Sequence, residues 1–147
     1  GVCAIFQSRI KNEQSPVIFE DGRQTRDFVS IHDIVRACVL SMEKSGADYE
    51  AVNVGSGKPT SIEEVAEVLL RLYGSELRPK VERKFRAGDV RHCSADLTKI
   101  RKLLGFEPTA RFEDGMRELV AWGQSVKATD RFDEALTELR SKGLVEK

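Results

Sequence analysis

Arg26 stands where its side chain could bind a phosphate group. It follows Asp21-Gly22, a pair typical of a hairpin turn, and precedes the apolar run 28–31, which has the composition of a strand. We therefore expect Arg26 near the start of that strand, with its backbone held rigidly. A guanidinium held in this way suits a bidentate contact with phosphate oxygens. The competing interpretation is a surface arginine that pairs with the adjacent Asp27.

A second arginine lies in the sequence Arg86-Ala87-Gly88-Asp89. Gly88 predicts a turn, and Asp89 supplies a carboxylate next to it. If this segment meets Arg26 in the folded chain, the two arginines and Asp89 form a clamp for a pyrophosphate and a ribose. The competing interpretation is a solvated basic surface, because Arg86 belongs to a positively charged run with Arg83, Lys84 and Arg91.

The glycine-rich turn Gly55-Ser56-Gly57 precedes a predicted helix and has two interpretations. It could bind an anion at the helix N-terminus, or it could be a tight turn from a strand into the helix. We favour the tight turn, because the segment matches neither G-x-G-x-x-G nor a G-K-[ST] ending. Asn53 lies just before the turn, and its amide could bind a ligand or the backbone of the loop.

Residues for catalysis and for metal binding are not recognisable. The residues four positions after Tyr49 and Tyr73 are Asn53 and Leu77, so no Tyr-x-x-x-Lys pair is present to act as a general base. No glycine-rich dinucleotide loop is present either. The two histidines, His32 and His92, lack acidic or cysteine partners at metal-binding spacing, so we predict no metal site.

The composition is typical of a globular domain. The 147 residues include 40% hydrophobic and 33% charged residues, and 24 basic residues balance 24 acidic ones. A net charge of zero argues against nucleic acid or an anionic membrane as partners, and no apolar run reaches the length of a membrane span. Three widely spaced cysteines predict free, buried thiols in a reducing cytoplasm: Cys3, Cys38 and Cys93.

The elements that position these side chains alternate between strands and helices. We expect strands at 17–20, 28–31, 51–54 and 80–85, the first two forming a hairpin, and helices ending near residue 12 and over 32–44, 62–73, 97–104, 112–122 and 130–142. This order predicts an α/β fold with a small, partly parallel sheet and flanking helices. We expect a main portion, 1–124, and a C-terminal helical tail, 125–147.

Several motifs occur together in a recognisable order. They are Pro16-Val17-Ile18-Phe19-Glu20-Asp21-Gly22, Arg26-Asp27-Phe28-Val29-x-Ile31-x-Asp33, Asn53-Val54-Gly55-x-Gly57, Arg86-x-Gly88-Asp89, Ala95-Asp96 and Leu104-Gly105-Phe106. Over residues 1–124 this combination resembles the C-terminal half of extended short-chain dehydrogenase/reductases that epimerise or dehydrate nucleotide sugars. The resemblance implies that most of the Rossmann domain, with NAD and the Tyr-x-x-x-Lys catalyst, lies outside this chain.

The resemblance also implies roles for individual residues. Arg26 and Arg86 resemble the arginines that bind the diphosphate, and Asp89 resembles the acceptor near the ribose. The remaining matched positions would line the base, add a polar contact and form the rim of the pocket: Val17 and Phe19, Asn53, and Val2. The substrate would be a dTDP-, UDP- or GDP-sugar. This chain alone would bind no NAD and supply no catalytic residue.

Two features of the sequence lean towards one subgroup, the dTDP-L-rhamnose 4-epimerases. They are the segment 88–96 and the tail motifs in 130–144. We expect a fragment that forms the substrate-binding portion of a cytoplasmic, homodimeric enzyme. The alternatives are a freestanding nucleotide-sugar-binding module and a non-catalytic interaction protein.

Overall fold

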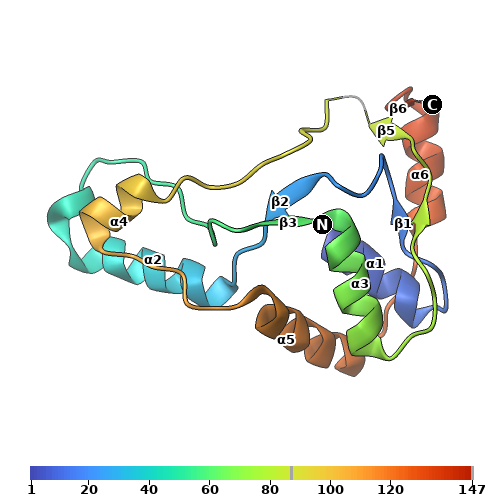
Figure 1. The fold of residues 1–147 in the computed structure, drawn as a ribbon, viewed down its shortest axis with the longest axis horizontal. Coiled ribbons are helices and arrows are strands. Elements are labelled where there is room, and N and C mark those ends of the chain that lie inside the picture. The colour runs from blue at the N-terminus through green and yellow to red at the C-terminus, as the bar shows by residue number, and fades with distance from the viewer. Residues whose placement is uncertain (87, 147) are drawn as a thin grey trace. The chain divides into compact units, whose positions relative to one another are not determined.

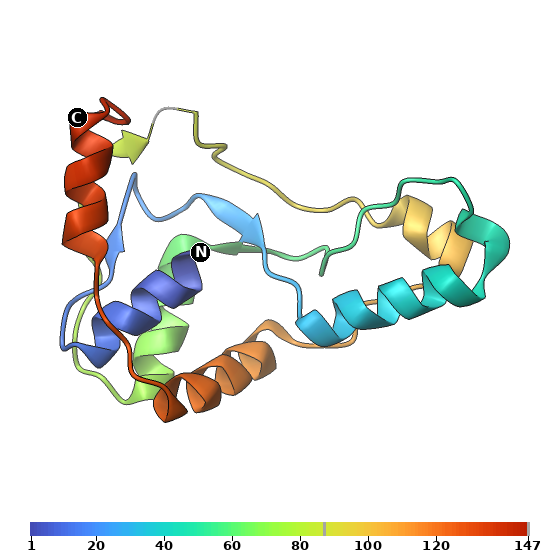
Figure 2. The same ribbon diagram turned by 180° about the vertical axis from the view of Figure 1, so that it is seen from behind.

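The computed structural model describes residues 1–86 and 88–146, and the side chains of Arg86 and Glu146 are outside that description. The chain divides into two compact units (Figures 1 and 2). Unit 1 comprises Gly1–Gln24, Ser61–Arg91 and Met116–Lys147, and unit 2 comprises Thr25–Thr60 and His92–Gly115. Each unit is described by itself.

Unit 1 is built on two packed helices, α1 (Val2–Lys11) and α3 (Ile62–Tyr73). The apolar face of α3 is buried, as its helical spacing predicts, and α1 contributes Phe6 and Ile10 to the interior. Ser61 caps α3 by accepting a hydrogen bond from the Glu64 N–H at 3.1 Å. The other elements of unit 1 are β1 (Val17–Ile18), β4 (Lys80–Val81), β5 (Phe85–Arg86), most of α5 (Phe112–Ser125), α6 (Phe132–Ser141) and β6 (Val145–Glu146).

The strands of unit 1 pair in two small sheets. β1 runs parallel to β4, with Val17 opposite Lys80. Beyond the strands, this pairing continues through a 2.6 Å hydrogen bond from the Glu20 N–H to the Lys84 carbonyl. β5 runs antiparallel to β6. The parallel pair joins segments more than sixty positions apart in sequence, as in an α/β fold.

Unit 2 contains β2 (Thr25–Asp27), α2 (Ile31–Glu43), a 3₁₀ turn at Ser45–Ala47, most of β3 (Pro59–Ser61) and α4 (Thr98–Leu104). β2 pairs with β3. The core of the unit gathers around Ala37 of α2 and four residues from α4 and its flanks, Leu97, Ile100, Leu104 and Phe106. The buried Asp33 carboxylate ties α2 to the segment after α4, since it accepts bonds from the N–H groups of Thr109 and Ala110 at 3.0–3.1 Å.

The mixed α/β fold with a partly parallel sheet is confirmed, but the predicted hairpin is wrong. β1 pairs with β4 instead of with 28–31, and Ile31 begins α2. The hydroxyl of Ser30 accepts a hydrogen bond from the His32 N–H at 3.2 Å, so helix capping overrides the strand propensity of the apolar run. Arg26 does lie in a strand, β2.

Two other predicted strands also differ. Residues 51–54 are irregular. The segment 80–85 is divided between β4 and β5 because Arg83, with φ of 51°, interrupts the extended backbone. The helices near 2–11, 31–43, 62–73, 98–104, 112–125 and 132–141 agree with the predictions to within a few residues.

The cysteines are free, as predicted, but they are not all buried. Cys38 and Cys93 are exposed, and Cys3 is half-buried. Burial raises the pKa of the Cys3 thiol. Among the residues described, no helix is long and apolar enough to cross a membrane.

Candidate functional site

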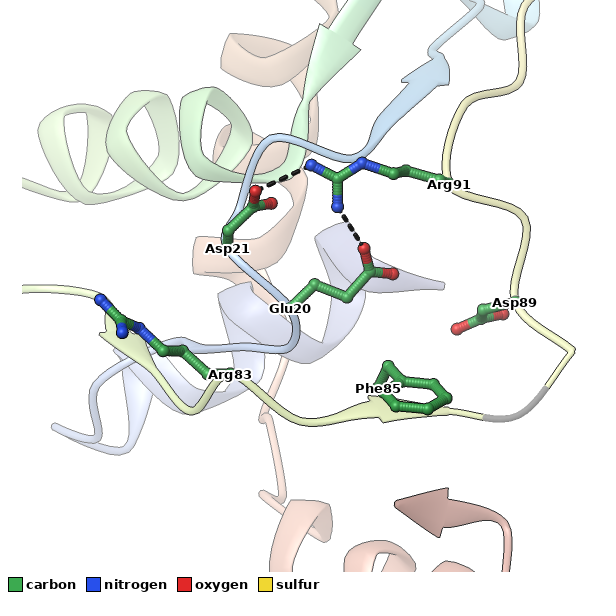
Figure 3. Close-up of a pocket in the computed structure, with 6 residues that line it drawn as sticks. All are labelled: Glu20, Asp21, Arg83, Phe85, Asp89 and Arg91. Carbon is green, nitrogen blue, oxygen red and sulfur yellow. Dashed lines mark hydrogen bonds and ion pairs between the residues drawn. The ribbon is translucent and has the colours of Figure 1, made fainter. Parts of the chain in front are cut away.

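Unit 1 contains an open pocket of about 620 Å³. Three short segments supply its walls: the turn after β1, the approach to β5, and the segment that follows the turn at Gly88 (Figure 3). The lining residues are Glu20, Asp21, Arg83, Phe85, Asp89 and Arg91. The pocket therefore offers guanidinium groups, carboxylates and the face of an aromatic ring.

The backbone around the pocket adopts an uncommon conformation at two positions. Glu20 has φ of 55° and Arg83 has φ of 51°, in the left-handed region that non-glycine residues seldom adopt. Each such residue costs about 1–2 kcal/mol relative to ordinary backbone. The bond between Glu20 and Lys84 joins the two strained segments directly. Strain of this kind is concentrated at functional sites, so the pocket is the leading candidate site in unit 1.

Arg91 fastens one wall of the pocket to another. Its guanidinium donates to Glu20 at 2.7 Å and to Asp21 at 2.8 Å (Figure 3). The bond from Arg91 lowers the pKa of Asp21 to about 2, and the same contacts raise the pKa of Arg91. This fork holds the segment that carries Asp89 against the turn after β1.

The remaining pocket residues have the chemistry to bind a phosphorylated ligand. Arg83 is exposed, and no hydrogen bond or ion pair engages its guanidinium within the part of the chain that the structure describes. The Phe85 ring is 44% exposed and lies near Asp89 in Figure 3. Gly88 has φ of 83° and lies in a turn, as predicted. A cation, an aromatic face and a carboxylate acceptor thus share one pocket.

The predicted site residues of unit 1 lie in and around this region. Asp89 lines the pocket, and Arg86 lies in β5, although its side chain and Ala87 fall outside the described residues. Val17 is buried in β1. Phe19 and Val2 are half-buried, the latter in α1. Their roles towards a ligand stay predictions.

Two further predicted residues belong to unit 2. Arg26 lies in β2, half-buried, and its guanidinium donates to the Thr25 carbonyl at 2.8 Å. Asn53 is exposed in an irregular segment. Because Arg26 and Arg86 belong to different units, the clamp that combines them stays a prediction.

The glycine-rich turn at 55–57 binds an anion from its own chain, the Asp27 carboxylate. This carboxylate accepts bonds from the Ser56 N–H at 2.7 Å, the Ser56 hydroxyl at 2.6 Å, the Gly57 N–H at 2.9 Å and the Ala95 N–H at 3.1 Å. Burial opposes ionisation of Asp27, but the hydrogen bonds from Ser56, Ala95 and Gly57 together outweigh it, and the pKa is lowered. The tight-turn interpretation therefore describes this segment.

Gly55 shows how closely this turn packs. A Cβ atom at Gly55 would lie 2.6 Å from the Asp27 carboxylate and 2.5 Å from the Ala95 Cβ. The amides of the turn are thus committed to Asp27, and the turn does not fit the pyrophosphate of a dinucleotide.

Sequence reasoning did not identify most of the pocket lining. Arg83 and Arg91 were recognised only as members of a charged run, and Glu20, Asp21 and Phe85 were not candidates. Signals were nevertheless available, because Glu20 and Asp21 lie in the matched motif 16–22 and Arg91 lies in the segment 88–96. The pairing of β1 with β4, which creates the pocket, has no local sequence signal.

The sequence of this chain matches known proteins of one family. The family model described as GDP-mannose 4,6 dehydratase matches residues 3–119. The dTDP-L-rhamnose 4-epimerase of Burkholderia thailandensis is 38% identical over 83% of this chain and 33% of its own length. The UDP-glucuronate 4-epimerase of Thermodesulfobacterium geofontis is 40% identical over 76% of this chain and 34% of its own length.

Solved structures agree. The UDP-glucose 4-epimerase of Thermotoga maritima, solved with UDP-glucose, superimposes with a TM-score of 0.78 at 36% identity, over 85% of this chain and 40% of that one. A UDP-glucuronic acid 4-epimerase from Bacillus cereus, solved with UDP-glucuronic acid and NAD, has a TM-score of 0.79 at 24% identity, over 86% and 40%, and supports the fold.

The chain spans about a third of the length of the curated relatives it matches. The family model covers most of the chain, and the order of the matched motifs, the fold and these relatives agree with one another. The chain belongs to the nucleotide-sugar epimerase and dehydratase family of extended short-chain dehydrogenase/reductases.

Proposed function

We propose that this chain is the portion of an NAD-dependent nucleotide-sugar 4-epimerase that binds the nucleoside diphosphate of the substrate. The observation that carries the proposal is the pocket of unit 1. It contains Asp89, lies next to the strand of Arg86 and is lined by an exposed aromatic ring and by Arg83. These are groups that bind a ribose, a diphosphate and a base.

Arg86 is the proposed diphosphate ligand of this unit, and Asp89 is the proposed acceptor for the ribose hydroxyls. Val17, Phe19 and Val2 would line the base and the rim of the pocket. Arg26 and Asn53, which belong to unit 2, are further proposed ligands of the substrate. Each charge-assisted bond to a phosphate contributes about 1.5–3 kcal/mol, which corresponds to roughly a tenfold or greater change in affinity.

The rest of the proposal concerns the intact protein. NAD, when bound, would accept and return a hydride during epimerisation, and we propose that it is held outside this chain. The Asp27-bound turn at 55–57 supports this assignment, because the amides of Ser56 and Gly57 already donate to Asp27.

We also propose that the intact protein is a cytoplasmic homodimer that acts on a dTDP-, UDP- or GDP-sugar. The free thiols of Cys3, Cys38 and Cys93 agree with a reducing compartment. Epimerisation by residues 1–147 alone would refute the proposal that NAD and the catalytic residues lie outside this chain.

Isothermal titration calorimetry with UDP, dTDP and GDP tests the binding site in the protein as its gene encodes it. We expect one nucleotide to bind and Arg86→Ala to weaken that binding by about tenfold or more. Arg111→Ala is the matched control, because Arg111 is an exposed arginine of unit 2. Equal affinities for the Arg86→Ala and unmodified proteins would refute the assignment of Arg86, and no binding of any nucleotide would refute the proposed site.

A further inference from the structure

The C-terminal tail, residues 126–146, lies outside the part of the chain that the family model matches, 3–119. Its first residues are held by the end of α1. The ammonium group of Lys11 donates to the Val126 carbonyl, and the side-chain amide of Asn12 donates to the Ala128 carbonyl at 3.2 Å. The tail is therefore attached to the main body of unit 1 from its beginning.

A largely buried ion pair holds the next part of the tail. Arg9 of α1 donates to Asp130 at 3.2 Å, with side-chain exposures of only 8% and 15%. The same guanidinium donates to the Ser15 carbonyl at 2.7 Å and lies 4.6 Å from the centre of the Phe132 ring. Arg9 thus connects the tail to the segment that leads into β1.

Phe132, the first residue of α6, packs against a proposed site residue. Its ring lies 6.3 Å from the ring of Phe19, which follows β1 and is a proposed base-lining residue. One turn further on, Leu136 is buried, so α6 rests on unit 1 through its apolar face. The tail therefore packs against a proposed base-lining residue.

The end of the tail reaches the other wall. Gly143, with φ of 66°, ends α6 and turns the chain into β6. β6 lies beside β5 (Figure 1). The two strands are antiparallel, with Val145 opposite Arg86. Within the described residues, β6 is the strand that pairs with β5, so the backbone that carries Arg86 is held by the tail.

We propose that residues 126–146 position the proposed nucleotide site, with Phe132 acting through Phe19 and β6 acting through the backbone of Arg86. The inference rests on the proposed function for its consequence in binding. The tail residues are positioning residues, because they act on the substrate through Phe19 and β5. Without β6, β5 would lose the strand that pairs with it among the described residues. The Glu20–Lys84 bond and the Arg91 fork alone would then hold the segment 84–91, so the ligand would have to supply part of its ordering.

The test uses Val145→Pro, whose ring fixes φ near about −65° and so opposes the extended backbone of β6, and Phe132→Leu, which keeps an apolar side chain but removes the ring. Val145→Ala keeps the backbone N–H and is the control for the strand, and Glu138→Ala, at an exposed position of α6, is the control for the helix. Two quantities are measured in the protein as its gene encodes it: amide hydrogen exchange over 84–91, and the dissociation constants for UDP and dTDP.

We expect Val145→Pro to speed exchange over 84–91 and to weaken nucleotide binding about tenfold, the change that ordering one loosened residue produces. Phe132→Leu should weaken binding a fewfold, and both controls should stay within about twofold of the unmodified protein. In the intact enzyme the loss should appear in KM, with kcat unchanged.

The inference would be overturned if both Val145→Pro and Phe132→Leu leave amide exchange over 84–91 and the nucleotide dissociation constants unchanged. It would also be overturned if the two variants lower only the unfolding temperature. If Val145→Pro does not fold, Phe132→Leu decides. If the unmodified protein binds neither UDP nor dTDP, the proposed site is refuted, while the exchange rates still show whether the tail holds β5.

Discussion

Replacing Asp27 with asparagine should destabilise unit 2 strongly, although the two side chains have nearly the same shape. Oδ1 of Asp27 accepts two bonds from Ser56, and Oδ2 accepts bonds from Gly57 at 2.9 Å and Ala95 at 3.1 Å. An asparagine keeps one oxygen in this arrangement. If its NH₂ group takes the place of Oδ2, the N–H groups of Gly57 and Ala95 lose their acceptor. If it takes the place of Oδ1, the Ser56 hydroxyl can turn to accept from it, and only the Ser56 N–H loses its acceptor.

The expected cost follows from the less costly of these two orientations, in which one N–H is unsatisfied. Each unsatisfied donor in a partly buried site costs about 1–3 kcal/mol, so Asp27→Asn should lower the free energy of unfolding by about 1–3 kcal/mol. For a chain of this size that corresponds to a fall of roughly 3–10 °C in the unfolding temperature. Circular dichroism during heating measures the fall, and hydrogen exchange at Ser56, Gly57 and Ala95 locates it.

The depressed pKa of Asp27 also predicts how the stability of the protein changes with pH. The folded-state pKa of Asp27 is depressed, so its stabilising contribution is fully present above the ordinary carboxyl pKa of 3.8 and is lost as the pH falls through the lower, folded value. Asp27→Asn should therefore show a flatter loss of stability below pH 4 than the unmodified protein. Asp48→Asn, at an exposed position, is the control. A difference of 2 °C in unfolding temperature corresponds to about 0.5–1 kcal/mol for a chain of this size. An Asp27→Asn protein that melts within 2 °C of the unmodified one would therefore refute the reasoning.

Two further predictions concern unit 1. Arg91→Ala should raise the pKa of Asp21 from about 2 towards 3.8, because the hydrogen bond that lowers this pKa most is lost. Carbon NMR of the Asp21 carboxyl group measures the pKa. A pKa that stays near 2 in Arg91→Ala would contradict the fork that Arg91 forms with Glu20 and Asp21. Gly123→Ala should destabilise the chain by about 1–3 kcal/mol, because its Cβ would lie 2.0 Å from Nε2 of Gln7. Gly115→Ala in the same helix has nothing within 4 Å and should be stabilising by about 0.4–1 kcal/mol; urea denaturation compares the two, and equal effects would contradict the packing.

Local signals predicted the helices well. Ser61 with the N–H of Glu64 begins α3, and Gly74, with φ of 62°, ends it. The strands were predicted poorly, because each is only two or three residues long and depends on a distant partner. The run 28–31 illustrates the competition, since a serine cap at Ser30 started a helix within residues of high strand propensity.

The sequence by itself determined the family, most of the helices, and the places of Arg26, Arg86 and Asp89 within the family's motifs, because all of these depend on the spacing of residue types along the chain. Only the tertiary structure decided which neighbours those positions have. The pairing of β1 with β4 brings Glu20 and Asp21 to Arg91, and Asp27 occupies the amides of the turn at 55–57. Such contacts join residues tens of positions apart, so their free energy depends on how the whole unit packs and leaves no periodic pattern in the sequence.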